Sequence, residues 1–125
     1  MTEDYPGYER EVLFPDRLQQ LFSEQQRIEA KRFGEVTLTT EGLRSMILAC
    51  MMEVGECLDE MQWKPWKGAT PDSPPEVNRN AMLEELADVF LFTIAITRRI
   101  DFSATDFYRA VKAKLAYNEG RLDHA

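Results

Sequence analysis

The sequence has few of the residues on which common catalytic and metal-binding motifs depend. Its one histidine is His124, and its two cysteines are Cys50 and Cys57. A Ser-His-Asp or Cys-His mechanism and a histidine-rich zinc site therefore have almost nothing to be built from. Within one helix the two cysteines would lie about 10 Å apart, too far for a disulfide. We expect reduced thiols, and chemistry that depends on carboxylates and amines, with or without a hard metal ion.

Positive net charge and long apolar runs are also absent. The net charge is -7 at pH 7, whereas a protein that binds a phosphate backbone needs a basic face, so we do not expect a nucleic acid partner. Because there is no run of about 18 apolar residues, and no N-terminal segment with a basic start and an apolar middle, we expect neither a membrane span nor a secretion signal. The expected location is the cytoplasm, or the host cytoplasm if the protein is viral.

The composition that is present is typical of a globular protein. The chain has 125 residues, of which 44% are hydrophobic and 30% charged. A chain of this length buries roughly two thirds of its unfolded surface and is too short for two ordinary domains. We therefore expect residues 1–125 to form a single domain.

Hydrophobic periodicity predicts an all-α fold, a bundle of four to five helices. Residues 1–12 contain "YPGY" and are expected to be irregular. From Pro15 to about Phe33 the apolar residues fit one helical face, with Gly34 placed to stop the helix.

The second expected helix has the most regular apolar spacing in the sequence. It runs from about Glu41 to Met61, and Thr39 or Thr40 can cap its start. The segment that follows, residues 64–75, holds four of the six prolines and is predicted to be a loop.

Two further helices are expected in the second half of the sequence. The third runs from Pro75 or Glu76 to about Arg99. Its later part, "VFLFTIAIT", would also suit a buried strand, but the length of the segment without glycine or proline favours one long helix, apolar nearly all round. A fourth helix follows the expected capping pair of Ser103 and Asp106 and ends near Gly120.

Two pairs of acidic residues share a spacing that places each pair on one helical face. Glu53 and Glu56 lie on the second expected helix, and Glu85 and Asp88 on the third. If these helices pack antiparallel, four carboxylates meet and need a cation, and an all-oxygen set suits Mg²⁺ or Mn²⁺ better than zinc or copper. Each pair taken alone would be better explained as a solvated acidic stripe, and it is the presence of two matching pairs that favours a cation site.

The acidic pairs and two further segments resemble a known family. "EVGE" at 53–56 and "EELAD" at 84–88 provide E-x-x-E and E-x-x-D with 28 residues between them. This order is similar to the signature of the all-α nucleoside triphosphate pyrophosphatases, which include MazG-like proteins and dimeric dUTPases. An aromatic and lysine cluster, "WKPWK", and a late K-x-x-x-N-x-x-R within "KLAYNEGR" resemble the dimeric dUTPase branch.

This resemblance implies hydrolysis of a deoxynucleoside triphosphate to the monophosphate and pyrophosphate, with Mg²⁺ as cofactor. It implies that Glu53, Glu56, Glu85 and Asp88 hold the metal ions and that Glu53 and Glu56 are catalytic, with Glu53 orienting or deprotonating the attacking water. The substrate that we expect is dUTP or another pyrimidine deoxynucleotide.

The remaining site residues expected from sequence would contact the substrate. Lys114, Asn118 and Arg121 share one helical face and can present two cations and an amide to a triphosphate; alternatively they complement a helix dipole. Lys64 and Lys67 can reach phosphates, and Trp66 can stack on a base, although loop lysines are usually solvated and tryptophans are more often core or interface residues. The family's first helix contacts the base, and here Gln26 is our choice among several glutamines.

We expect the protein to associate with copies of itself. The apolar third helix suggests a covering subunit, and thus a homodimer or homotetramer. A non-enzymatic helical interaction module that dimerises through this helix is the alternative to an enzyme. A di-iron bundle is excluded, because it needs Glu-x-x-His pairs.

Overall fold

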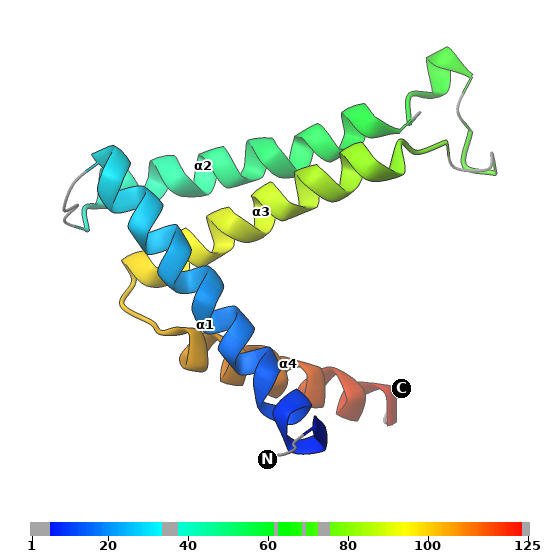
Figure 1. Ribbon diagram of the computed structural model, residues 1–125. Helices are drawn as coiled ribbons and strands as arrows, with labels where there is room; N and C mark the ends of the chain where they lie inside the picture. Colours follow the sequence, from blue (N-terminus) through cyan, green and yellow to red (C-terminus); the bar gives the residue numbers. More distant parts are fainter. Residues whose placement is uncertain (1–5, 34–37, 62, 69, 73–75, 124–125) are drawn as a thin grey trace. The chain divides into compact units, whose positions relative to one another are not determined.

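The computed structural model contains helices and short connections, which confirms the all-α prediction (Figure 1). It describes residues 6–33, 38–61, 63–68, 70–72 and 76–123. Within these residues the only β-type pairing is an isolated antiparallel bridge between Met61 and Val77. None of the described helices is both long enough and apolar enough to cross a membrane.

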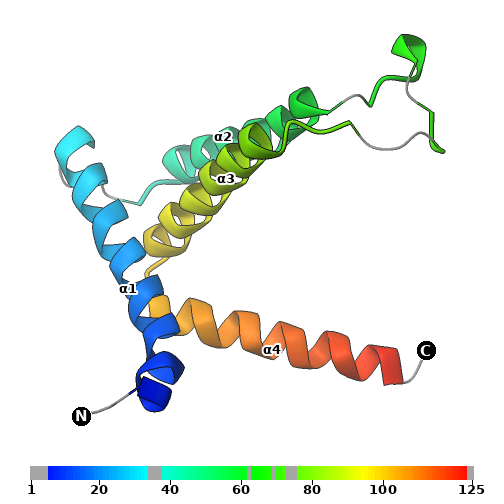
Figure 2. The ribbon, with the colours of Figure 1, turned by 45° about the vertical axis from the view of Figure 1, so that its right-hand side comes forward.

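The chain divides into two compact units, which are described separately. We call Thr37–Ile96 the hairpin unit, and Met1–Val36 together with Thr97–Ala125 the terminal unit. The hairpin unit contains α2 (Thr40–Glu56), the 3₁₀ helices η1 (Cys57–Glu60) and η2 (Pro65–Lys67), and most of α3 (Arg79–Arg99). Figures 1 and 2 both show α2 and α3 side by side and running in opposite directions.

Helix α2 begins where the sequence predicts and ends earlier than predicted. The Thr39 hydroxyl accepts a hydrogen bond from the Gly42 amide at 2.9 Å, so Thr39 is the N-cap. The α-helix ends at Glu56, and the last predicted turn is the tighter helix η1. Such tightening is common at helix ends, where the last carbonyls lack α-helical partners.

Helix α3 starts at Arg79, a few residues after the predicted start. Asn78 caps it, because its side-chain oxygen accepts a hydrogen bond from the Ala81 amide at 3.2 Å. The backbone N–H of Asn78 donates in turn to the backbone carbonyl of Glu60 at 2.8 Å. Together with the Met61–Val77 bridge, this bond joins the end of η1 to the start of α3. Pro75, one of the predicted starts, lies outside the described residues.

A sharp turn separates α3 from α4 (Ala104–Asp123). Asp101 has a φ of 67°, and the amides of Asp101 and Phe102 donate to the carbonyls of Arg98 and Thr97 at 3.0 and 3.1 Å. This pattern is a Schellman cap, which glycine usually occupies because a side chain is strained at positive φ.

The start of α4 confirms the predicted capping pair. The Ser103 amide donates to Asp106 at 3.0 Å, and the Asp106 amide donates to the Ser103 hydroxyl at 3.1 Å. Both bonds also lower the pKa of Asp106, because they stabilise its charged form. The predicted end of α4 at Gly120 was wrong, since the helix continues to Asp123.

The terminal unit packs α1 (Pro6–Phe33) against α4. The prediction that residues 1–12 are irregular was wrong from Pro6 onward, because helix-forming Glu, Arg and Leu residues outweigh the break expected at Pro15. Phe22 is buried and contacts Phe107 with ring centroids 6.1 Å apart. Gly34, the predicted stop, lies outside the described residues.

Within the chain itself, the hairpin unit leaves much apolar surface open. On α3 the buried residues are Ile94 and Ala95, whereas α2 has no buried residue. A stripe of exposed apolar side chains follows each helix, at Ile47, Met51 and Val54 on α2, continued by Leu58 on η1, and at Leu83, Leu86 and Phe90 on α3. Leu48 and Met52 are also exposed, on the neighbouring row of α2. Spacings of three and four residues place each stripe on one helical face. The first half of α3 therefore keeps apolar side chains that this chain does not cover, whereas its second half is mostly half-buried or buried.

Candidate metal centre

Three carboxylates meet at the interface between α2 and α3. Glu53 and Glu56 come from the last turn of α2, and Glu85 comes from the second turn of α3. Each offers one oxygen, and these oxygens all lie within 4.8 Å of one another. The antiparallel packing of the two helices therefore brings three of the four predicted ligands together, with Asp88 outside the group.

The environment of these carboxylates fits a hard cation. Glu53 and Glu85 are half-buried, and the Oε2 atom of Glu85 is buried without a hydrogen-bond partner among the described residues. A buried carboxylate oxygen without a partner is costly unless a charge or a donor reaches it. Because the donors are all oxygen atoms, the chemistry of the cluster favours Mg²⁺, Mn²⁺ or Ca²⁺ over softer metals.

Hydrogen bonding, burial and neighbouring negative charges raise the pKa values of two of these carboxyl groups. A hydrogen bond with Glu56, burial, and the charges of Glu56, Asp88 and Glu85 together raise the pKa of Glu53 to about 7. Burial and the charge of Glu56 raise the pKa of Glu85 as well. Both shifts mean that, in the absence of a cation, protons partly neutralise the cluster.

Asp88 and Glu60 lie at the edge of the cluster. Asp88 is exposed and does not belong to the three residues whose oxygens meet, but its charge raises the pKa of both Glu53 and Glu85. Glu60, in η1, also raises the pKa of Glu85. The sequence prediction left Glu60 out of the ligand set, although its position four residues after Glu56 could have suggested the same face.

The aromatic and lysine cluster after η1 is open to solvent. The rings of Trp63 and Trp66 meet edge to face with centroids 5.9 Å apart, and Lys64 Nζ lies 5.6 and 5.7 Å from the two centroids. Trp66 is 70% exposed, so the core role that tryptophan usually has does not apply within this chain. A hollow of about 190 Å³ beside them is lined by Leu58, Asp59, Met61, Trp63, Lys64 and Lys67.

The late basic motif lies on the second half of α4, in the terminal unit. Lys114, Asn118 and Arg121 are all exposed and all helical. Between them stands Tyr117, whose ring centroid is 5.2 Å from Lys114 Nζ and 5.9 Å from Arg121 Cζ. The sequence prediction overlooked Tyr117, although its spacing of three and four residues from the two cations was a readable signal.

The glutamines of α1 differ in what their side chains contact. Gln19 donates to Ser23 at 3.1 Å, and Gln25 donates to Glu29 at 2.9 Å. Gln26 is exposed, and no described residue is recorded as a hydrogen-bond partner of its side chain. Of the three, Gln26 is thus the amide that local bonds occupy least.

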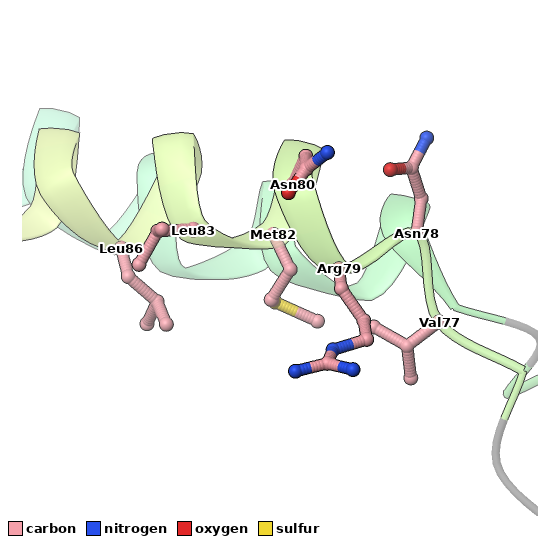
Figure 3. Close-up of a pocket in the computed structure, with 7 residues that line it drawn as sticks. All are labelled: Val77, Asn78, Arg79, Asn80, Met82, Leu83 and Leu86. Atoms are coloured by element: carbon pink, nitrogen blue, oxygen red, sulfur yellow. The ribbon is translucent and has the colours of Figure 1, made fainter.

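A larger hollow of about 780 Å³ lies along the first turns of α3, lined by Val77, Asn78, Arg79, Asn80, Met82, Leu83 and Leu86. Figure 3 shows Arg79, Met82 and Val77 on one side of the helix, with the amides of Asn78 and Asn80 pointing to the other. Two of the lining residues, Leu83 and Leu86, belong to the exposed apolar stripe of α3. The hollow therefore continues that stripe toward the start of the helix.

Comparison with known proteins identifies the family of the chain. The sequence model of the dUTPase family matches residues 17–123. Among curated proteins, dCTP pyrophosphatase 1 of Mus musculus is 35% identical over 78 residues, and those of Bos taurus and Homo sapiens are 33% identical over 78 residues. Each alignment covers 62% of this chain but only 44% of the relative, so the chain spans less than half the length of these proteins. No solved structure is a significant match. The family match extends over most of the sequence and includes both acidic motifs, and the chain therefore belongs to the dUTPase family, of the all-α nucleoside triphosphate pyrophosphatase type.

Proposed function

We propose that this protein hydrolyses a pyrimidine deoxynucleoside triphosphate, most favourably dUTP or dCTP, to the monophosphate and pyrophosphate with the help of Mg²⁺. The observation that carries the proposal is the meeting of Glu53, Glu56 and Glu85 within 4.8 Å, contributed by two helices. Family membership supports the same reaction class. The name of the relatives, dCTP pyrophosphatase, and that of the family, dUTPase, both point to pyrimidine nucleotides.

Glu53, Glu56, Glu85 and Asp88 would hold the divalent ions, with Mn²⁺ as an alternative to Mg²⁺. When bound, such ions neutralise charge on phosphate oxygens and make water more acidic. The inclusion of Asp88 is supported by its charge, which raises the pKa of both Glu53 and Glu85. Without bound cations, the negative charges of the carboxylates would repel the polyanionic triphosphate. Bound ions would therefore be needed before the substrate can approach the cluster.

Glu53 and Glu56 would provide the base catalysis. Glu53 shares a hydrogen bond with Glu56, so the two carboxylates can hold one proton between them. Either group could accept a proton from the attacking water and later return it to solvent.

The base and the phosphates would contact several of the residues predicted from the sequence. Trp66 offers an exposed ring for stacking, Gln26 offers an amide with both a donor and an acceptor, and Lys64 and Lys67 lie beside the hollow next to η1. Lys114, Asn118 and Arg121 would bind the triphosphate tail, because cations and amide donors are the groups that phosphate oxygens accept from.

We further propose that the protein works as a homodimer or homotetramer in the cytoplasm. The apolar stripes of α2 and α3 lie on one chain's surface, and monomers rarely expose a contiguous apolar patch of more than a few hundred Å². A second copy is the fitting cover, since a symmetric interface lets the same stripes cover each other.

A matched pair of substitutions tests this association. Met51 lies on the stripe, whereas Met52, also exposed, lies about 100° further around α2. Met51→Glu should shift the assembly toward the monomer in light scattering after size exclusion, and Met52→Glu should leave its mass unchanged. Equal behaviour of the two variants would contradict the stripe as the interface.

The activity itself is tested with purified protein, Mg²⁺ and a panel of dUTP, dCTP, dTTP, dATP and dGTP, by measuring pyrophosphate release. We expect release from pyrimidine nucleotides and none after chelation of divalent ions. Glu56→Gln and Asp88→Asn should each lower kcat by about 100-fold or more, because several kcal/mol of transition-state stabilisation depends on the ions.

Glu41→Gln is the control, since Glu41 is an exposed carboxylate on the same helix, away from the cluster. Its activity should equal that of the unmodified protein. Pyrophosphate release that survives both site substitutions would refute the site even if the activity were real. An intact dimer that releases no pyrophosphate from any nucleotide would instead favour the non-enzymatic interaction module.

A further inference from the structure

Tyr117 is the one aromatic residue in the second half of α4, and it contacts both cations of the late basic motif without belonging to that motif. Lys114 Nζ lies 5.2 Å and Arg121 Cζ 5.9 Å from its ring centroid. Lys114 is three residues before Tyr117 and Arg121 four residues after it, the spacings at which helical side chains are neighbours.

These contacts bring both cations to one ring. Lys114 and Arg121 lie on nearly the same line of the helix, about two turns apart, with Tyr117 between them along the chain. The face of an aromatic ring attracts cations within about 6 Å. Both cationic side chains therefore contact the same ring, on the same helical face.

The position of Tyr117 does not suit a role in packing. Its side chain is 60% exposed, and the contact of α4 with α1 is made further toward the start of the helix, by Phe107 with Phe22. The exposed apolar residues Leu115 and Leu122 are about 140–160° away around the helix at about 100° per residue. Burial against another surface through that stripe would leave Tyr117 on the opposite side.

We propose that Tyr117 is a positioning residue that pre-orders Lys114 and Arg121 to receive the anionic tail of the substrate. The inference rests on the proposed function of those two cations and deepens it. On the helix, the two cations lie between the ring on one side and the Asn118 amide on the other, within an arc of about 100°. A phosphate group placed on the two cations would meet the amide at its flank, while the ring limits the directions in which the cations can move.

The energetic basis is pre-organisation. Long cationic side chains lose rotamer freedom on binding, and side chains that are already confined lose less. A cation–π contact at an exposed site is weak, so a phosphate oxygen can replace the ring as the partner without a large penalty. The ring itself is needed for this role and the hydroxyl is not.

Substitutions of Tyr117 separate the contribution of its ring from that of its hydroxyl group. Tyr117→Leu should raise KM for the deoxynucleotide about 3- to 10-fold and weaken the binding of inorganic tripolyphosphate by the same factor, as expected when two side chains lose their confinement. The kcat should change less than about 2-fold, because the ring touches no reacting atom. Tyr117→Phe, which keeps the ring, should behave like the unmodified protein in both measurements.

A second readout reports on the contact itself. The side-chain methylene protons of Lys114 and Arg121 should show upfield ring-current shifts in NMR spectra of the unmodified protein and of Tyr117→Phe. In Tyr117→Leu these shifts should disappear. Tyr117→Met provides a second variant without a ring.

The possible results have distinct meanings. Lost ring-current shifts with unchanged KM and unchanged tripolyphosphate affinity would overturn the positioning role. A Phe variant as impaired as the Leu variant would overturn it too, because the hydroxyl would then be the active group. If Lys114→Met and Arg121→Met also leave the tripolyphosphate affinity unchanged, the phosphate-binding assignment of the proposed function fails as well. Absence of pyrophosphatase activity with intact tripolyphosphate binding would refute the reaction and leave the role of Tyr117 standing.

Discussion

Removing the negative charge of Glu29 is the strongest single test of how the terminal unit is held together. Arg98 Nη1 lies 2.9 Å from the Glu29 carboxylate and Arg99 Nε 3.8 Å, and Gln25 donates to its other oxygen at 2.9 Å. Glu29 is buried, while the side chains of Arg98 and Arg99 are 21% and 15% exposed. The cluster links α1 to the end of α3, where the chain turns toward α4.

Glu29→Gln should destabilise the protein by about 2 to 3 kcal/mol. Breaking a buried ion pair by removing one partner typically costs about 3 to 5 kcal/mol, because a charge is left without compensation. We expect a loss of about 2 to 3 kcal/mol, below this typical range, because both arginines keep part of their surface in water and can recover some hydration. Replacing both partners, as in Glu29→Met with Arg98→Met, should recover part of the loss, since no charge of that pair then remains uncompensated.

The assay is urea unfolding followed by far-UV circular dichroism, at one fixed protein concentration so that association does not alter the comparison. Glu24→Gln is the matched control, since Glu24 is exposed on the same helix; it should stay within about 0.5 kcal/mol of the unmodified protein. A Glu29→Gln variant as stable as this control would refute the reasoning, because the cluster would then contribute no net stability.

Three further predictions concern the metal cluster and the link between α3 and α4. Because folding raises the pKa of Glu53 from 4.5 to about 7, the folded protein binds this proton more tightly, so the stability it contributes is present below pH 4.5 and is lost as the pH rises through about 7. The melting temperature of the metal-free protein should therefore fall relative to that of Glu53→Gln across this range, and a constant difference would contradict the shift. Asp101→Gly should raise the free energy of unfolding by about 0.5 to 1 kcal/mol in thermal melts, because glycine accepts the positive φ without strain; a loss of stability would show that the Asp101 side chain contributes more than its strain. Ser103→Ala should lower the free energy of unfolding by about 1 kcal/mol, as the loss of an N-cap does, and an unchanged melt would mean that the capping pair is not needed.

The features that depend on local chemistry were predictable from the sequence. Thr39 as a cap and the pair of Ser103 and Asp106 involve neighbours within three residues, so the sequence alone determines them. The meeting of the two acidic motifs was predictable because each has helical spacing and the segment between them is long enough to reverse the chain. Glu53, Glu56 and Glu85 accordingly lie where the antiparallel hypothesis requires.

The features that the sequence did not reveal depend on contacts between distant residues or on competing helix signals. The bond from Asn78 to Glu60 fixes where α3 begins, and nothing in either local sequence points to the other residue. The continuation of α4 past Gly120 reflects a balance between helix formers and one glycine that propensity alone does not decide. The exposure of Trp66 could not be foreseen, because a tryptophan in a loop is equally compatible with a buried position.

The anchoring of the segment between η1 and α3 has a consequence for how the protein can vary. The Met61–Val77 bridge and the bond from Asn78 to Glu60 hold the two ends of this segment together. Insertions, deletions or whole-segment exchanges between these anchors would leave the spacing of the acidic helices unaltered. The sequence of this segment could therefore diverge through natural or laboratory selection, with the carboxylate cluster inherited unchanged.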